Sequence, residues 1–377
     1  MELVVAVVCA LFTSFWICGL TIRAARVLKF GVDESVGVQK SHSHWVPRLG
    51  GIPIFVAFLA GILLLAWESS LYEREAAFLI VCLLPAFGIG LVEDVTRRAG
   101  VLARLIFTMV AAAMGWWLLG AGLHRLDLPV VDGWLASSSA FAFVLTLVAA
   151  AGLAHAVNIV DGCNGLSSFV SAVVLASLGV VAMMVGDDLV ARIAFIAVAA
   201  LAGFFFWNFP FGRIFLGDAG AYMVGFLIAE VSMLLVVRNP EVSAWFPMLL
   251  MVYPVWETLF SMGRRARYGL RQMGLPDALH LHQLILRRLV RLFPGSLDPN
   301  HRILRNSIAS TYLWLLAVLC AVPAVFFHKN AEVLMVSCVL FVAVYLWLYR
   351  SLVTFKAPSF MRLTSDPVKE YLPRQST

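Results

Sequence analysis

The chain has 377 residues, of which 62% are hydrophobic and only 13% are charged, and its mean hydropathy is +0.91. This composition excludes an ordinary soluble enzyme and is typical of a membrane protein with several transmembrane helices. The net charge of +6 could suggest a nucleic-acid partner. In a membrane protein, however, such an excess more often reflects the retention of Lys and Arg in the cytoplasm, so we expect no nucleic-acid partner.

Apolar runs of membrane-spanning length occur about 11 times along the chain. They lie at residues 3–22, 49–67, 77–92, 101–123, 141–157, 166–185, 189–206, 221–237, 245–262, 308–327 and 331–348. The first run lacks the basic start and the clear cleavage site of a signal peptide, so we interpret it as a membrane helix. The sequence predicts an all-α polytopic membrane protein, with a single catalytic domain over residues 1–353 and a cytoplasmic tail at residues 354–377.

Basic residues are distributed unevenly between the two ends of these helices. If successive helices alternate in direction, 23 of the 28 Lys and Arg residues fall on one side of the membrane and 5 on the other. The positive-inside rule assigns the richer side to the cytoplasm, which puts the N-terminus outside and the C-terminus inside. Cytoplasmic connections are then expected near residues 23–48, 93–100, 158–165, 208–220 and 263–306.

Acidic residues gather on the predicted cytoplasmic side. They are Glu93, Asp94, Asp161, Asp218 and Glu257. Asp161 belongs to the polar stretch NIVDGCNGL (residues 158–166), and Asp218 belongs to FLGDAG (residues 215–220). A few carboxylates with room for phosphate oxygens are what Mg²⁺ or Mn²⁺ requires. Any one of these acids alone would equally suit a helix cap or a pair with a neighbouring Arg.

The long basic loop carries Arg264 and Arg265 and then the sequence DALHLHQ at residues 277–283. His280 and His282 would diverge on a helix, whereas on an extended or irregular segment they could face one ligand. A histidine pair is usually structural, and arginines beside a membrane usually face lipid headgroups. Phosphate recognition is the sharper alternative for both groups.

Two other polar features interrupt the apolar pattern. Lys40 and Arg48 precede a Gly-Gly pair where the chain re-enters the membrane, which suits either interfacial snorkelling or a cationic groove for a lipid phosphate. Glu230 lies deep in the eighth apolar run and is a functional candidate by default. It is far from the cytoplasmic acids, so we leave it outside the site.

These motifs together resemble the polyprenyl-phosphate N-acetylhexosamine-1-phosphate transferases, which are also called glycosyltransferase family 4. The resemblance rests on Lys40 with PRLGG (residues 47–51), GLVED (90–94), NIVDGCNGL (158–166), FLGDAG (215–220) and HLH (280–282). It extends over roughly residues 40–288 and is closer to the branch that initiates O-antigen or teichoic acid than to the peptidoglycan branch.

The resemblance implies a fold of eleven helices and a reaction at the cytoplasmic face of the bacterial inner membrane. Enzymes of this family transfer a sugar 1-phosphate from a UDP-N-acetylsugar to undecaprenyl or another polyprenyl phosphate, use Mg²⁺ or Mn²⁺, and release UMP. The product initiates a cell-surface polysaccharide. Formation of a homodimer through a helix face is left open.

The resemblance also implies roles for particular residues. The expected catalytic residues are Glu93, Asp94, Asp161, Asp218, His280 and His282. The expected substrate-binding residues are Lys40, Arg48, Asn158, Asn208, Arg264 and Arg265. Asp218 is the principal metal ligand in this interpretation, with Asp94 beside it, and Lys40 is the candidate for the lipid phosphate.

The chain departs from the family pattern at four positions. Glu93, Asn164, Ala221 and Gln283 stand where Asp, Asp, Ser and His are usual. Glu93 keeps the negative charge and Gln283 keeps hydrogen bonding, so the reaction class is expected to persist. The departures motivate one alternative, an inactive relative that acts as a scaffold. A transporter or flippase is the other alternative, because intramembrane acids also build ion or lipid pathways.

Overall fold

The computed structural model describes residues 2–28, 32–33, 46–68, 73–267, 279–290 and 299–354. Its helices are α1 (Glu2–Leu28), α2 (Gly51–Glu68), α3 (Glu73–Thr96), α4 (Val101–Leu118), α5 (Pro129–Ser137), α6 (Ser139–Val160), α7 (Leu166–Met184), α8 (Asp188–Asn208), α9 (Gly217–Arg238), α10 (Trp245–Leu250), α11 (Val252–Ala266), α12 (Leu281–Arg288), α13 (Pro299–Phe326) and α14 (Ala331–Val353). Two short strands, β1 (Val32–Asp33) and β2 (Val46–Pro47), pair antiparallel. The predicted all-α polytopic membrane fold is confirmed.

Nine helices of the described residues are long and apolar enough to cross a membrane. They are α1, α3, α4, α6, α7, α8, α9, α13 and α14. The apolar part of α2, Gly51–Trp67, is shorter. All the predicted apolar runs are therefore helical, but the run at residues 245–262 is not one continuous helix, because α10 and α11 divide it. The prediction of a single spanning helix there is wrong, and the orientation of the bundle stays a prediction.

A proline explains the division between α10 and α11. Met251 separates the two helices with φ −98° and ψ 5°. Pro254 has no N–H to donate to the carbonyl of Leu250, and its ring crowds that carbonyl, so an α-helix is not favoured through this point. Hydropathy does not register the effect, which is why the sequence predicted one span.

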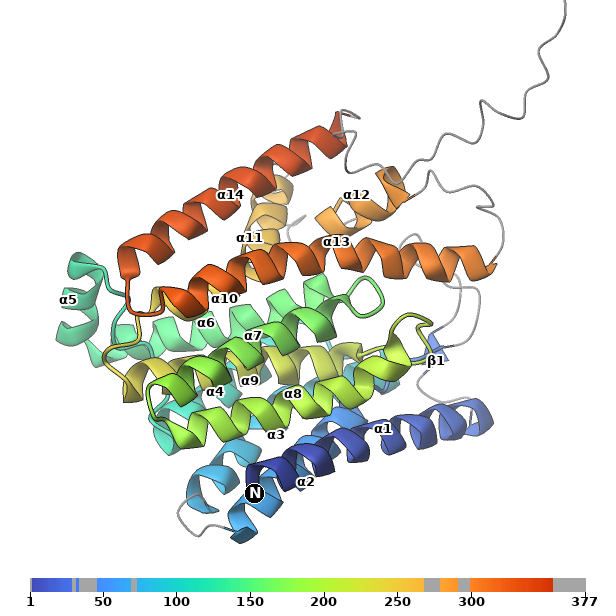
Figure 1. Cartoon of the computed structure of the whole chain (residues 1–377), viewed down its shortest axis with the longest axis horizontal. Coiled ribbons are helices and arrows are strands. Elements are labelled where there is room, and N and C mark those ends of the chain that lie inside the picture. The colour runs from blue at the N-terminus through green and yellow to red at the C-terminus, as the bar shows by residue number, and fades with distance from the viewer. Residues whose placement is uncertain are drawn as a thin grey trace, which may run out of the picture.

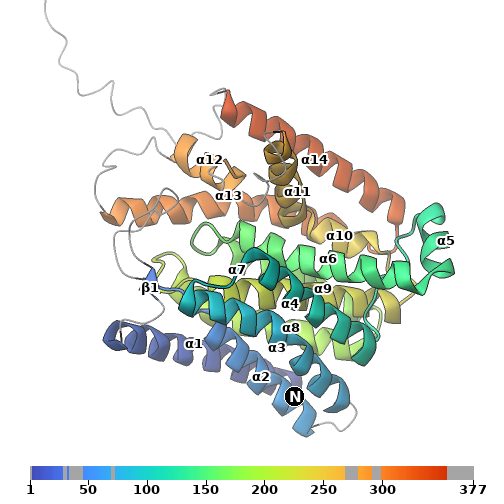
Figure 2. The same cartoon turned by 180° about the vertical axis from the view of Figure 1, so that it is seen from behind.

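The long helices run side by side, with α13 and α14 along one edge of the bundle and α1 and α2 along the opposite edge (Figures 1 and 2). Helix α9 is the central element, because every residue from Gly217 to Val236 is buried. It packs against α3, α6, α7 and α2. The loop between α6 and α7 and the strand β1 lie at the same end of the bundle, at the right of Figure 1.

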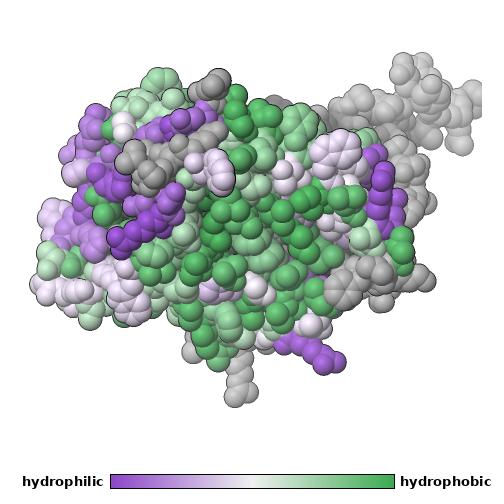
Figure 3. Space-filling view, turned by 90° about the horizontal axis from the view of Figure 1, so that it is seen from below, coloured by the Kyte–Doolittle hydropathy of each residue, from purple (hydrophilic) through white to green (hydrophobic). Residues whose placement is uncertain are grey.

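A broad apolar band covers the face of the molecule shown in Figure 3, and the polar residues gather towards its two ends. More than half of the surface of Leu20, Val144 and Leu319 is exposed. Large apolar side chains exposed over a whole band would be unfavourable in water but are suited to hydrocarbon. The molecule is therefore a multi-pass membrane protein.

Glu230 is buried in the middle of α9, and its Oε1 atom has no hydrogen-bond partner among the described residues. At 1.5 Å per helical residue, it lies about 18 Å from Asp218 along the helix axis. This separation agrees with its exclusion from the predicted site.

Candidate active site

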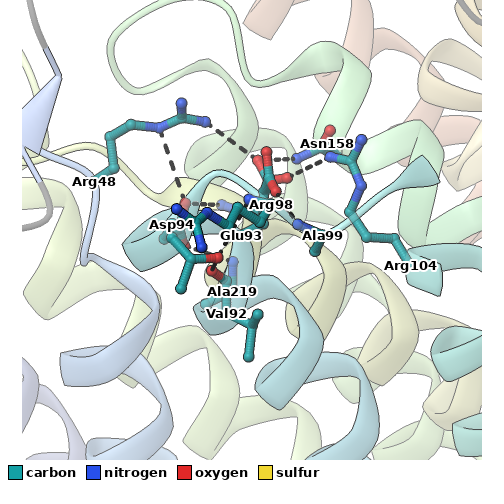
Figure 4. Close-up of polar contacts among 11 residues, drawn as sticks. Arg48, Val92, Glu93, Asp94, Arg98, Ala99, Arg104, Asn158 and Ala219 are labelled. Carbon is teal, nitrogen blue, oxygen red and sulfur yellow. Dashed lines mark hydrogen bonds and ion pairs between the residues drawn. The ribbon is translucent and has the colours of Figure 1, made fainter.

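The carboxylate of Asp218 is contacted by three polar side chains from distant parts of the chain. Arg48 Nη2 lies 3.2 Å from Asp218 Oδ1, and Arg104 Nη1 lies 2.8 Å from Oδ2. The amide Nδ2 of Asn158 donates to Oδ1 at 3.1 Å. Figure 4 shows Arg48 approaching this point from one side and Arg104 and Asn158 from the other. The structure thus brings two predicted site residues, Arg48 and Asn158, to the buried carboxylate of a third, Asp218, together with Arg104.

Two backbone hydrogen bonds hold Arg48 in this position. The N–H of Gly50 donates to the carbonyl of Phe215 at 2.9 Å, and the N–H of Phe215 donates to the carbonyl of Pro47 at 2.9 Å. The chain on both sides of Arg48 is therefore attached to the segment that leads into α9. These paired bonds hold the backbone on both sides of Arg48 next to the start of α9, which places its side chain within reach of Asp218.

Asp94 caps the N-terminus of α9. Its Oδ1 accepts the N–H of Asp218 and its Oδ2 accepts the N–H of Ala219, both at 2.8 Å. The first N–H groups of a helix have no partner within the helix, and a carboxylate there also interacts favourably with the helix dipole. The sequence left open whether Asp94 caps a helix, pairs with an Arg or binds a metal, and the structure shows that it forms a helix cap. Its role as a metal ligand stays a prediction and would use the remaining lone pairs of the carboxylate.

Gly217 makes this cap sterically feasible. Its φ of +74° lies in the left-handed region that residues with a Cβ rarely adopt. A Cβ at this position would lie 2.0 Å from the Arg48 carbonyl oxygen and 2.6 Å from Asp94 Oδ2. The glycine before Asp218 therefore allows β2, α3 and α9 to meet at one point.

Glu93 is directed towards the turn that leads into α4. Its Oε2 accepts the N–H of Ala99 at 2.9 Å, while the Thr96 hydroxyl closes the end of α3 on the carbonyl of Val92 at 2.6 Å. Figure 4 shows these contacts beside Asp94. Glu93 thus stabilises the connection to the helix that carries Arg104, and its catalytic role stays a prediction.

Asp161 follows α6 directly, at the start of the loop that the sequence singled out. It keeps some contact with solvent. Its partial withdrawal from water raises the pKa of Asp161 to about 7, with smaller contributions from the carboxylates of Asp218 and Asp94, while Arg48 opposes the shift. Asp161 is therefore within electrostatic range of Arg48, Asp94 and Asp218.

The remainder of this loop is anchored inside the protein. The N–H of Asn164 donates to Asn306 Oδ1 at 2.6 Å. Asn208 accepts the N–H of Gly165 at 2.5 Å and donates to the carbonyl of Ile214 at 2.7 Å. Both ends of the Asn208 amide are therefore engaged in holding the loop. Its predicted contact with substrate stays a prediction.

His280 and His282 lie on the same side of the chain. His280 is the extended residue before α12, and His282 is in the first turn of that helix. Their rings are parallel within 4°, with centroids 5.6 Å apart. A Cβ added to Gly162 would lie 2.1 Å from His282 Nε2. Because His280 is extended, its ring can lie parallel to that of His282. His282 in turn contacts Gly162 in the loop between α6 and α7.

Arg264 fixes the segment that precedes His280. Its Nη1 donates to the carbonyl of Leu279 at 3.0 Å and also to the hydroxyl of Tyr349. The guanidinium lies 5.7 Å from the centre of the Phe260 ring, a distance typical of a cation–π contact. These contacts give Arg264 a structural role, and its predicted contact with substrate stays a prediction.

Two further predicted substrate-binding residues have different outcomes. Arg265 lies in the last turn of α11, where its Nε donates to the carbonyl of Ser261 at 3.3 Å. Lys40 lies outside the described residues. Contacts of both residues with substrate stay predictions.

Arg104 is the site residue that sequence reasoning missed, because it was counted only as a marker of topology. It is the only charged residue of α4, and an arginine within an apolar helix indicates function by default. That signal was available. One turn after Asp218 on α9, the Tyr222 ring packs against the His155 ring of α6 with centroids 4.8 Å apart.

The donor chemistry of the site fits a divalent cation that substrate helps to hold. Among the described residues, no group of three or more His, Cys, Asp or Glu side chains is arranged to hold a metal ion alone. The carboxylates of Asp218 and Asp94, which lie side by side at the start of α9, offer hard oxygen atoms of the kind that Mg²⁺ prefers. Mg²⁺ commonly takes one or two protein carboxylates and completes its coordination with water and phosphate oxygens, so this set is sufficient.

The burial of His282 predicts a pH dependence of stability that does not require activity. Burial, with a smaller effect of His280, lowers the pKa of His282 to about 4, whereas an unfolded His titrates near ~6.5. Between pH ~6.5 and pH about 4, the unfolded chain takes up a proton at His282 and the folded chain does not. The free energy of unfolding therefore falls by up to ~3 kcal/mol as the pH is lowered from ~6.5 to about 4. Thermal unfolding in detergent at stepped pH should therefore depend less on pH in His282→Gln than in the wild type. Equal slopes would contradict the burial of a neutral His282.

Comparisons with known proteins found a matching family model and similar bacterial proteins. Residues 76–236, which include six of the predicted site residues, match the model described as Glycosyl transferase family 4. The chain is 27% identical over 300 residues to a Bacillus subtilis (strain 168) protein named Probable undecaprenyl-phosphate N-acetylglucosaminyl 1-phosphate transferase, covering 76% of this chain and 77% of that protein. It is 26% identical over 370 residues to the Decaprenyl-phosphate N-acetylglucosaminephosphotransferase of Mycolicibacterium smegmatis, covering 90% and 85%. It is also 27% identical over 268 residues to the Undecaprenyl-phosphate alpha-N-acetylglucosaminyl 1-phosphate transferase of Salmonella typhi, covering 69% and 70%.

Proposed function

We propose that the chain is a member of glycosyl transferase family 4 and that it transfers an N-acetylhexosamine 1-phosphate from a UDP-sugar to a polyprenyl phosphate. The products are a polyprenyl-diphosphate-sugar and UMP. The observation that carries the proposal is the convergence of Arg48, Arg104 and Asn158 on Asp218 at one end of a membrane bundle. Guanidinium groups balanced by a carboxylate suit two substrates that both carry phosphate, one of which is a lipid.

The reaction requires positioning more than proton abstraction. An oxygen of the acceptor phosphate attacks the donor phosphorus that carries the sugar, and the bond from that phosphorus to the bridging oxygen of the diphosphate breaks to release UMP. The second pKa of a phosphate monoester is near ~6. The acceptor is therefore mostly dianionic at neutral pH, and the main demand is to hold several negative charges together.

Arg48 and Arg104 meet this demand. Without substrate, both guanidinium groups neutralise the carboxylate of Asp218. A guanidinium binds phosphate through parallel hydrogen bonds, so both groups exchange Asp218 for phosphate oxygens when the substrates enter. Asp94 keeps the start of α9 in place during this exchange, because both of its oxygens accept backbone N–H groups at 2.8 Å, whereas its pairing with Arg48 Nε is longer, at 3.9 Å.

The exchange leaves the Asp218 carboxylate available to a cation. In this proposal Asp218 is the principal ligand of Mg²⁺ or Mn²⁺, with Asp94 beside it. When bound, the ion supplies positive charge that neutralises the donor diphosphate. The support is the chemistry of the oxygen donors and the family resemblance.

We further infer that the protein lies in the bacterial inner membrane with the Asp218 end of the bundle in the cytoplasm. The positive-inside rule supports this orientation, because 23 of the 28 Lys and Arg residues fall at that side. The relatives named above are bacterial. A UDP-sugar made in the cytoplasm would then reach the site without crossing the membrane.

The test is to offer purified protein, undecaprenyl phosphate and Mg²⁺ a panel of UDP-N-acetylsugars and to follow UMP release. UDP-N-acetylglucosamine is expected to be the active donor, since the relatives are named for that sugar. Release should require both the lipid and the cation. Intact protein that releases no UMP with any donor would contradict the proposal and favour a scaffold or a transporter.

A further inference from the structure

Glu257 is a fully buried carboxylate on α11 that does not belong to the cluster around Asp218. Its Oε1 lies 2.9 Å from His280 Nδ1, and its Oε2 accepts the hydroxyl of Tyr345 at 2.8 Å. The backbone N–H of Leu281 lies 3.3 Å from both oxygens. A buried charge is strongly unfavourable unless donors surround it. Hydrogen-bond donors from α14 and from the start of α12 therefore hold the Glu257 carboxylate in one orientation.

This arrangement determines which atom of His280 is available to a ligand. A neutral imidazole carries its proton on one nitrogen only, and the hydrogen bond at one nitrogen sets the state of the other. Because Glu257 can only accept at Nδ1, the His280 proton is held there. Nε2, at the opposite edge of the ring, is then the nitrogen free to gain a proton or to meet a ligand.

His282 and Gln283 also restrict the position of the His280 ring. The His282 ring lies parallel to that of His280 at 5.6 Å, and its own Nε2 lies against Gly162. The Gln283 side chain accepts the backbone N–H of His280 at 3.4 Å. The two imidazoles thus form a layer between α11 and the loop that begins with Asp161.

We propose that Glu257 is a positioning residue that acts through His280, holding one proton on Nδ1 and directing Nε2 so that, when the ring carries its second proton, Nε2 donates to the diphosphate of the sugar nucleotide. The proposal rests on the proposed function, because the ligand of Nε2 is the donor of that reaction. Glu257 itself touches no substrate. It fixes the direction and the tautomer of the residue that does.

Glu257→Gln tests this role with little change in shape. The amide of Gln can donate to Nδ1, so the proton of His280 is no longer held on that nitrogen and the ring loses its fixed state. We expect kcat to fall at least ~10-fold, while KM for the UDP-sugar changes less than ~3-fold, since misdirection affects charge stabilisation more than ground-state binding. Glu230→Gln is the matched control, because it makes the same exchange at another buried carboxylate that lies outside the site. Its kcat should stay within ~2-fold of the wild type.

A double-mutant cycle separates action through His280 from a general effect on folding. His280→Gln alone should lower kcat on the order of 10²-fold. If Glu257 acts through His280, adding Glu257→Gln to that variant should lower kcat by less than ~3-fold more. A full further ~10-fold loss in the double variant would overturn the proposal, as would wild-type kcat in Glu257→Gln.

A spectroscopic measurement distinguishes failure of this proposal from failure of the proposed function. Protein labelled with ¹⁵N-histidine in lipid should show a His280 signal with a protonated Nδ1, identified by its absence in His280→Gln. Glu257→Gln should change that signal, and an unchanged signal would overturn the proposal whether or not the protein is active. If the wild type instead releases no UMP with any donor while the signal changes as expected, the reaction is wrong and the positioning of His280 stands.

Discussion

Asp218→Asn is expected to abolish transfer of sugar phosphate to polyprenyl phosphate, with turnover at least ~10³-fold below the wild type. Asparagine keeps the shape of the side chain but removes the charge that holds Arg48 and Arg104 and that would bind the cation. The variant should still insert and purify normally, because Asp94 bonds to the backbone of residue 218 and not to its side chain. The measurement is transfer of radiolabelled sugar phosphate from UDP-N-acetylglucosamine to the lipid fraction.

Asp187→Asn is the matched control. Asp187 is also 5% exposed and also pairs with an arginine, since Arg238 Nε lies 2.7 Å from its Oδ2 near the other end of α9. Loss of this pair should lower the melting temperature but leave turnover within ~3-fold of the wild type. Near-normal turnover of Asp218→Asn would remove Asp218 from the site. Equal inactivity of both variants would mean that buried ion pairs, and not the chemistry of Asp218, limit the enzyme.

The end of the bundle at which the site lies could be predicted from the sequence. Apolar runs and the count of basic residues both accumulate over many positions, so errors in single residues matter little. Alternation of the runs placed Asp94, Asp161 and Asp218 at the same end. The structure brings them together because α9 packs between α3 and α6.

The partner of Asp218 on α4 could not be predicted, because it depends on how that helix is rotated. Each residue turns an α-helix by about 100°, so a shift of one position would direct Arg104 away from α9. The buried face of α4 is formed by the small residues Thr108, Ala111, Ala112 and Gly115, so hydrophobicity alone does not identify it. The unusual position of Arg104 was therefore visible in the sequence, but its ion pair with Asp218 could not be predicted from it.

The roles of single acids and histidines also depended on local backbone geometry. The sequence allowed Asp94 either a helix cap or a metal site, and the cap became evident only from the position of the first N–H groups of α9. Likewise, the spacing of His280 and His282 allowed both divergence and convergence. One extended residue before α12 decided between them.

The contact between α3 and α9 predicts the second large effect. Gly90 lies one turn before Asp94, and a Cβ there would come within 2.5 Å of the Cα of Ala219, whose N–H Asp94 accepts. A backbone atom cannot move aside as a flexible side chain would, so α9 must shift away from α3. We expect Gly90→Ala to break the cap, to move Asp218 out of reach of Arg48, and to lower turnover on the order of 10²-fold. It should also destabilise the fold by about 2 kcal/mol in thermal unfolding.

Gly88→Ala provides the control for this variant. It adds the same methyl group to the same helix two residues earlier, where nothing lies within 4 Å of the new Cβ. Alanine is favoured over glycine in a helix by up to ~1 kcal/mol, so the melting temperature should stay the same or rise, and turnover should stay within ~2-fold. Since only Gly90 faces the start of α9, a difference between the two variants isolates that contact. Wild-type turnover of Gly90→Ala would mean that α3 does not approach α9 so closely, and the cap that orients Asp218 would lose its support.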